Sequence, residues 1–119
     1  MDRRRRSLTA LLALFGVCGL GCVSPTLPLP PPETPLISQG SAPNRFVLTG
    51  GKGSALPEAF IIAFNLSPSL PREQRVTGTQ ADEEGRWRIE LFASPGDRVD
   101  ITQERGDTRS PALSVSIPR

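Results

Sequence analysis

Hydrophobic and polar residues alternate along most of the chain after residue 44, in short runs that Gly, Pro and Asp separate. A period of two is typical of β-strands with one buried face, and no segment keeps the 3.6-residue period of an amphipathic helix. The pattern predicts six strands, at residues 45–49, 59–65, 75–80, 86–92, 98–103 and 113–117. We therefore expect an all-β fold, a small antiparallel β-sandwich of six to seven strands, over residues 44–119.

The first 21 residues differ from the rest of the chain. Residues 3–6 are four arginines, and an almost wholly apolar run follows from Ser7 to Leu20. A basic start, an apolar core and small residues at the end predict a secretory signal peptide over residues 1–21. The run is too short to span a bilayer.

The end of this segment, Gly19-Leu20-Gly21-Cys22, resembles the lipobox of bacterial lipoproteins. That resemblance implies cleavage before Cys22, acylation of Cys22 and attachment to a membrane of the cell envelope. Val23 stands where the family's sorting rule has Asp for retention in the inner membrane, which favours the outer membrane. The alternatives are Cys18 as the acceptor, or an ordinary secreted protein with Cys22 as a free thiol.

Residues 22–43 contain seven prolines. Proline fixes φ and removes a backbone donor, so we expect this stretch to be a disordered, extended tether that joins no sheet. At about 3.1 Å per residue it would reach roughly 65 Å. A proline-rich ligand for a partner's groove is the alternative function.

Charge and residue content exclude several functions. The chain has 14 Lys and Arg, 12 Asp and Glu and no His. Removal of residues 1–21 takes away four arginines and one aspartate, which leaves 10 basic and 11 acidic residues and removes the charge argument for nucleic-acid binding. Without His there is no imidazole to act as a base or as a metal ligand, and no segment predicts a cofactor site.

Three stretches carry a fold-level resemblance. They are Ala59-x-Ile61-x-Ala63-x-Asn65, the run Ala81-Asp82-Glu83-Glu84-Gly85-Arg86-Trp87, and Pro95-Gly96-Asp97-x-Val99-x-Ile101. Together they resemble bacterial immunoglobulin-like and carboxypeptidase-regulatory-like domains, with an Asp-rich turn before an inward aromatic residue. The resemblance implies an Ig-like or transthyretin-like sandwich and says little about activity.

The strand at residues 59–65 is apolar at every position before Asn65. If Ala59, Ile61 and Ala63 face the core, then Phe60, Ile62 and Phe64 form an exposed patch that would bind a protein partner. In the alternative arrangement the Phe side chains form the core and the alanines face outward.

Two acidic groups are weaker candidates. Asp82, Glu83 and Glu84 supply oxygen ligands suited to Ca²⁺, although a hairpin turn explains the same residues. Glu90 and Asp100 are the carboxylates that a glycosidase-like reaction would need. A sandwich of this size offers little room for a substrate cleft, so we do not expect an enzyme.

The sequence thus predicts a non-catalytic cell-envelope lipoprotein that acts as a tethered structural or protein-interaction module. Its expected partners are the membrane, through acyl groups on Cys22, and an envelope protein. The alternative is a module that binds a cell-wall glycan or another polysaccharide. It would depend on exposed aromatic residues, and the chain has only five Phe and Trp87, which we expect in the core.

Overall fold

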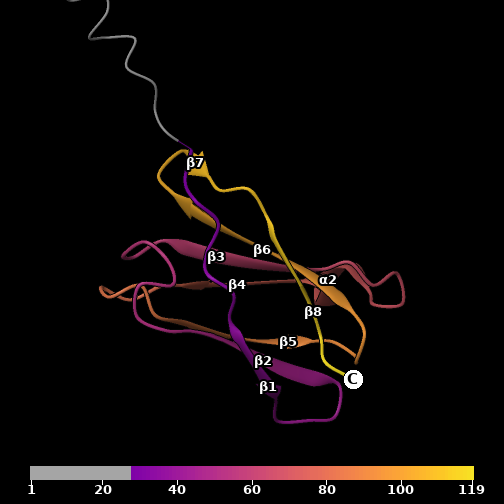
Figure 1. Cartoon of the computed structure of the whole chain (residues 1–119). Helices are drawn as coiled ribbons and strands as arrows, with labels where there is room; N and C mark the ends of the chain where they lie inside the picture. Colours follow the sequence, from indigo (N-terminus) through magenta and orange to yellow (C-terminus); the bar gives the residue numbers. More distant parts are fainter. Residues whose placement is uncertain (1–27) are drawn as a thin grey trace, which may run out of the picture.

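A computed structural model describes residues 28–119, and these residues form a sandwich of two antiparallel sheets (Figure 1). One sheet has three strands in the order β1-β2-β5, and the other has the order β4-β3-β6-β7 with β8 also paired to β6. The elements in chain order are β1 (Leu36–Gln39), β2 (Arg45–Gly50), β3 (Phe60–Asn65), α2 (Arg72–Arg75), β4 (Val76–Gln80), β5 (Trp87–Phe92), β6 (Arg98–Arg105), β7 (Thr108–Arg109) and β8 (Leu113–Ser116).

The prediction of an all-β sandwich is confirmed, but residues 28–119 contain eight strands rather than six or seven. The six predicted strands are present with bounds that shift by at most two residues. The additional ones are β1 and the two-residue β7. No helix in this part of the chain is long and apolar enough to cross a bilayer.

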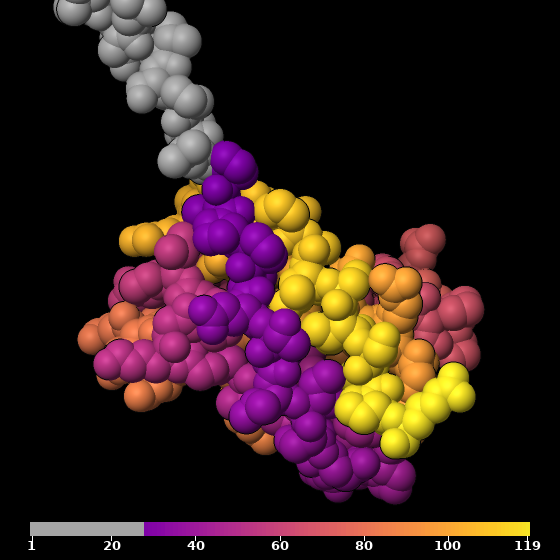
Figure 2. Space-filling view, in the orientation of Figure 1, coloured from indigo at the N-terminus to yellow at the C-terminus, as the bar shows by residue number. Residues whose placement is uncertain are grey.

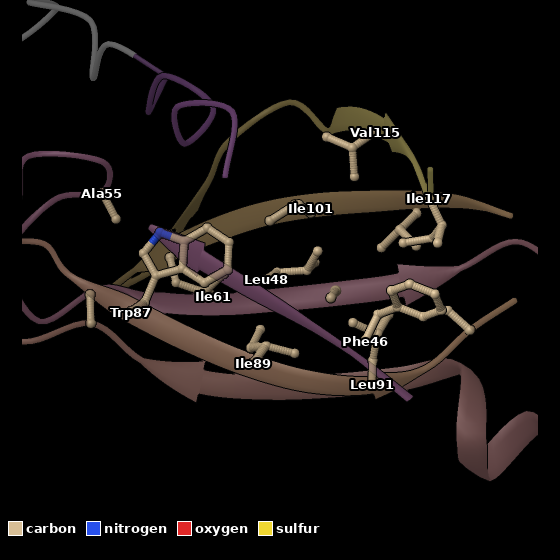
Figure 3. Packing of buried hydrophobic residues seen from close by; sticks show 14 residues of the cluster. Phe46, Leu48, Ala55, Ile61, Trp87, Ile89, Leu91, Ile101, Val115 and Ile117 are labelled. Carbon is tan, nitrogen blue, oxygen red and sulfur yellow. The ribbon is translucent and has the colours of Figure 1, made fainter. Parts of the chain in front are cut away.

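The core lies between the two sheets (Figure 3). One sheet contributes Phe46, Leu48, Trp87, Ile89 and Leu91, and the other contributes Ile61, Ile101 and Val115. The alternation Trp87-x-Ile89-x-Leu91 thus faces inward, as its period of two predicts, and each of these side chains is at most 4% exposed.

Trp87 lies flat against the backbone of the neighbouring strand. Its register partner is Gly50, where an added Cβ would lie 2.1 Å from the indole Nε1. The same N–H donates to the Ser54 hydroxyl at 3.1 Å. Glycine at position 50 therefore makes room for the largest side chain of the core, while the buried indole keeps a hydrogen-bond partner.

The expectation that residues 22–43 stay out of the sheets is wrong for β1, which pairs antiparallel with β2. Its four residues contain no proline and lie between Pro35 and Pro43, so every β1 residue keeps its N–H. The segment before β1 also packs on the domain. Pro32 and Pro35 are buried, and the Pro30 carbonyl accepts a hydrogen bond from Gln103 Nε2 at 2.6 Å.

Figure 2 shows this N-terminal part of the described chain (indigo) lying across the molecule beside the C-terminal part (yellow). Because Pro30 contacts β6 and β1 pairs with β2, the segment from residue 30 to residue 39 connects the two sheets at one side of the sandwich.

Candidate functional site

Strand β3 separates its apolar residues into two sets that face opposite sides of the five-stranded sheet. Ile61 and Ala63 face the core and are fully buried, as is Ala59 just before the strand. Phe60 and Phe64 face outward with 55% and 39% of their surface exposed. Of the two arrangements that the sequence leaves open, the one with the alanines inward is confirmed and the one with the Phe side chains in the core is wrong.

The orientation of β3 is fixed at its end by Asn65, which is fully buried. Its Nδ2 donates to the Phe92 carbonyl at 3.0 Å and to Asp97 Oδ2 at 3.1 Å, and its Oδ1 accepts from the Ser67 N–H at 2.9 Å. A slip of one residue would expose this amide and turn its neighbour Phe64 inward. Such a slip would leave Asn65 and its hydrogen-bond partners unsatisfied. That free-energy cost keeps Phe60 and Phe64 on the outer face of the sheet.

The outward side chains of β3 continue onto β4. Phe64 is paired with Val76, which is 50% exposed, and Ile62 is paired with Gly78. Leu66 follows at the next alternate position and is 43% exposed. We call Phe60, Ile62, Phe64 and Val76 the apolar face.

The apolar face has a polar border along β6. Phe64, Ile62 and Phe60 are paired with Asp100, Thr102 and Glu104 respectively. Asp100 accepts a hydrogen bond from the Ser114 hydroxyl, and Glu104 forms an ion pair with Arg109. Between the apolar and the charged halves lies a hollow of about 330 Å³, lined by Ile62, Phe64 and Val76 on one side and by Asp100, Thr102 and Arg109 on the other.

An apolar centre with a charged border has the composition of a protein-binding surface. Among residues 28–119, five large hydrophobic side chains are exposed, and Phe60, Phe64 and Val76 are three of them. A grouping of this kind on one sheet face marks a contact site more often than scattered exposed residues do.

The acidic turn at Asp82 is organised by hydrogen bonds of its own backbone. Asp82 Oδ1 accepts from the N–H groups of Glu84 at 2.8 Å and Arg86 at 2.9 Å, and Gly85 has φ +81°. These bonds, that of Arg86 first, lower the pKa of the Asp82 carboxyl below its ordinary value. Glu84 pairs with Lys52 and Arg86.

These bonds form the turn that the sequence offers as the alternative to a calcium site at Asp82, Glu83 and Glu84, although the turn is not a hairpin because it joins strands of different sheets. Within residues 28–119 no group of three His, Cys, Asp or Glu side chains is placed to hold a metal ion. One of the two carboxylate oxygens of Asp82, Oδ1, accepts from two N–H groups.

Glu90 and Asp100 do not form a pair. Their neighbours Ile89 and Leu91 on β5, and Val99 and Ile101 on β6, face the core, so both carboxylates point away from it on opposite sides of the sandwich. Glu90 Oε1 accepts from the Ser41 N–H at 2.7 Å, and this bond lowers the pKa of Glu90. The two groups cannot flank one glycosidic bond.

Two further predictions concern Cys22 and Trp87. Cys22 and the signal segment 1–21 lie outside the described residues. The expectation that Trp87 belongs to the core is confirmed, since it is only 4% exposed, and its ring therefore offers no platform on which a sugar could stack.

Sequence reasoning identified the β3 part of the site and missed Val76 and Arg109. Both reach the apolar face through strand pairing: Val76 lies opposite Phe64, and Arg109 lies opposite Glu104, which is itself paired with Phe60. Alternation shows which way a side chain points but not which strand lies beside it, so no signal in the sequence places these residues.

No model of a known protein family matches the chain, and no curated protein matches it in sequence. One similar solved structure is described as "Myokine structure". It is 14% identical, with a TM-score of 0.43, and the match covers 78% of this chain and all of that one.

Proposed function

We propose that this protein is a cell-envelope lipoprotein whose β-sandwich is a non-catalytic protein-interaction module. The observation that carries the proposal is the apolar face. Its side chains Phe60, Phe64 and Val76 each leave between 39% and 55% of their surface exposed to solvent. Exposing such groups to water is unfavourable by roughly 25 cal/mol per Å² of apolar surface, and a partner that covers them removes that penalty.

The anchoring part of the proposal is supported by the sequence of residues 1–22, in which a basic start and an apolar run end at a lipobox-like cysteine. Acylation of Cys22 would restrict the module to a membrane surface and raise its effective concentration toward other envelope proteins. The outer membrane is the favoured location because Val23 follows the cysteine.

The same geometry gives less support to glycan binding. Sugar-binding surfaces depend on accessible aromatic platforms and nearby hydrogen-bonding groups, and the buried Trp87 provides none. The exposed Phe60 and Phe64 lie beside the apolar Val76 and Ile62, and polar groups border them along β6.

Photo-crosslinking in the native membrane tests the proposal. A photoreactive residue at Phe60 or Phe64 should give discrete adducts with a protein, because a bound partner would cover both positions. The matched control carries the same residue at Arg88, which is exposed on the other sheet. Equal labelling at Phe60 and Arg88, or no protein adduct at either Phe position, would show that the apolar face is not a protein-binding surface.

A further inference from the structure

Residues 30–39, which we call the strap, lie across one side of the sandwich (Figure 2). At the start of the strap, the Pro30 carbonyl accepts from Gln103 Nε2 at 2.6 Å. The Glu33 N–H donates to the Ser54 carbonyl at 2.9 Å. At the end of the strap, β1 pairs with β2 along four residues. Hydrogen bonds therefore attach the strap to the sandwich at both of its ends.

The hydrophobic core contains little of the strap. Every side chain of the buried core cluster lies within residues 46–117, and the partly buried Ile37 packs against that cluster. Pro32 and Pro35 are buried as well, but Leu36 is 78% exposed. Removal of the strap would therefore leave the packing between the two sheets in place, as expected of a segment that opens locally.

The start of the strap does not fit closely against the domain. A hollow of about 190 Å³ lies between strap residues 30, 31 and 33 and the loop at residues 53–56. A contact that leaves such a gap gains less dispersion energy than a close-packed one. Opening this part of the strap exposes the fully buried Pro32 and breaks the two hydrogen bonds at Pro30 and Glu33.

The loop after the strap is fixed to β5. The Ser41 N–H donates to Glu90 Oε1 at 2.7 Å, and Arg45 forms an ion pair with the same carboxylate at 3.7 Å. The Arg45 guanidinium also lies 4.3 Å from the centre of the Phe92 ring. Beyond Arg45 the chain enters the core through β2. Detachment of the strap therefore has a structural end point at this loop.

A pull from the proposed anchor acts on the strap in the direction that opens it. β1 and β2 are joined by residues 40–44, so a force on Pro30 acts at the open end of the pair. The hydrogen bonds of the pair are then loaded one after another, from Leu36 to Gln39. Strands loaded in this way separate at a lower force than strands pulled along their length, because shear must break all bonds at once.

We propose that the strap detaches from the sandwich as a unit while residues 41–119 stay folded, so that the spacer between the membrane and the module has a short and a long state. The two lengths rest on the proposed function, because they require the anchor at Cys22. With the strap attached, the spacer consists of residues 23–29. Detachment adds ten residues, about 31 Å at 3.1 Å per residue.

The composition of the strap suits both states. Four of its ten residues are prolines. Proline restricts the detached chain, so the strap gains little conformational entropy on release and stays attached at rest. The same restriction keeps the free strap extended. A partner that holds the module farther from the bilayer than residues 23–29 can reach favours the long state, since only that state permits binding.

Native-state hydrogen exchange of the full chain, purified in detergent and read residue by residue, tests the detachment. The Glu33 N–H and the N–H groups of β1 that bond to β2 should show the same protection, because they open together. Their protection should be at least about a hundredfold lower than that of Ile61 and Ile101, which lie on inner strands of the five-stranded sheet. Equal protection of the strap and of these two residues would mean that the strap opens only with the whole domain, which overturns the proposal.

A disulfide between the strap and β2 is the matched control. Leu36→Cys combined with Thr49→Cys places two cysteines at paired, exposed positions, and the Cα separation of an antiparallel pair suits a disulfide. The oxidised form should exchange at least about tenfold more slowly at β1 and at Glu33 alike, and reduction should reverse this. Exchange at Glu33 that does not respond to the disulfide would show that the two ends of the strap open independently, contrary to the proposal.

Pulling on single molecules between residue 22 and the C-terminus tests the two lengths. A reversible lengthening of up to about 31 Å should precede unfolding of the domain, and the oxidised disulfide should shorten it to about 19 Å, the length of residues 30–35. Unfolding of the domain without an earlier step would overturn the long state.

The state of Cys22 separates this proposal from the function on which it rests. Early opening of the strap in a chain that is not acylated at Cys22 keeps the detachment and overturns both the anchor and the two spacer lengths. A strap as protected as the core in an acylated chain overturns the detachment and leaves the anchored interaction module intact.

Discussion

At the scale of single residues, Asp82 shows how one carboxylate fixes a turn. Its Oδ1 binds two backbone N–H groups, and its own backbone N–H and carbonyl bind Arg86 and Gly85. This turn joins β4 in one sheet to β5 in the other. These local hydrogen bonds therefore stabilise the turn through which the chain passes from one sheet to the other.

The lowered pKa of Asp82 predicts an acid-dependent contribution to stability. Because the folded pKa lies below the ordinary value of 3.8, the contribution is fully present above the unfolded pKa and is lost as pH falls through the folded pKa. Asp82→Asn keeps an acceptor for both N–H groups but not the charge. Urea unfolding should show a gap in stability between the two proteins at pH 7 that closes near pH 2.

Glu83→Gln, the same change on the neighbouring exposed residue, is the control for Asp82→Asn. It removes an equal charge from the turn without touching the two N–H bonds. If both variants showed the same pH dependence, net charge rather than the bonded carboxylate would be the cause.

At the scale of elements, the six strands with clear alternation could be predicted because burial of one sheet face imposes that pattern. β1 could not, since prolines on both sides of residues 36–39 dominate the composition of the region. The short helix α2 and the two-residue β7 are also below the length at which periodicity is informative. Alternation in the sequence predicts the half of the candidate site that lies on β3. Val76, Asp100 and Arg109 belong to the site only because the register of strand pairing places them beside that strand.

One buried side chain, Gln103, binds the segment before β1, which also bonds to the domain through the Glu33 N–H and the Ser54 carbonyl at 2.9 Å. Gln103 is 1% exposed, donates to the Pro30 carbonyl and accepts from the Leu56 N–H at 2.9 Å. Gln103→Leu leaves both partners unsatisfied and should lower the free energy of unfolding by about 2 kcal/mol. Urea denaturation of the full chain measures this change.

Gln80→Leu makes the same substitution at an exposed site, where Nε2 donates to the Glu58 carbonyl at 3.1 Å. Water can replace that bond, so the cost should stay below about 0.5 kcal/mol. Similar losses at positions 80 and 103 would mean that the contact with Pro30 contributes nothing to stability.

At the scale of the whole molecule, the packing of residues 30–39 changes the distance expected between the domain and the anchor proposed at Cys22. Of the predicted tether, only Val23 to Leu29, seven residues, separate Cys22 from the bound Pro30. Even fully extended they span about 25 Å, well short of the roughly 65 Å expected for the whole proline-rich segment. An anchored domain would therefore lie close to the bilayer, and its partners would have to be reachable there.

Energy transfer to the membrane surface measures this distance. A donor fluorophore on Asp107→Cys, at the exposed β6–β7 hairpin, should transfer efficiently to acceptors on lipid headgroups, because this hairpin follows Gln103 and so lies near the point where the chain joins the domain. Insertion of about 20 Gly and Ser residues after Leu27 should reduce the transfer, since the longer spacer lets the domain move away. Cys22→Ser should abolish it by removing the acylation site. Equal transfer with the native and the lengthened spacer would show that something other than these seven residues sets the distance, whereas transfer that persists in Cys22→Ser would contradict the anchor itself.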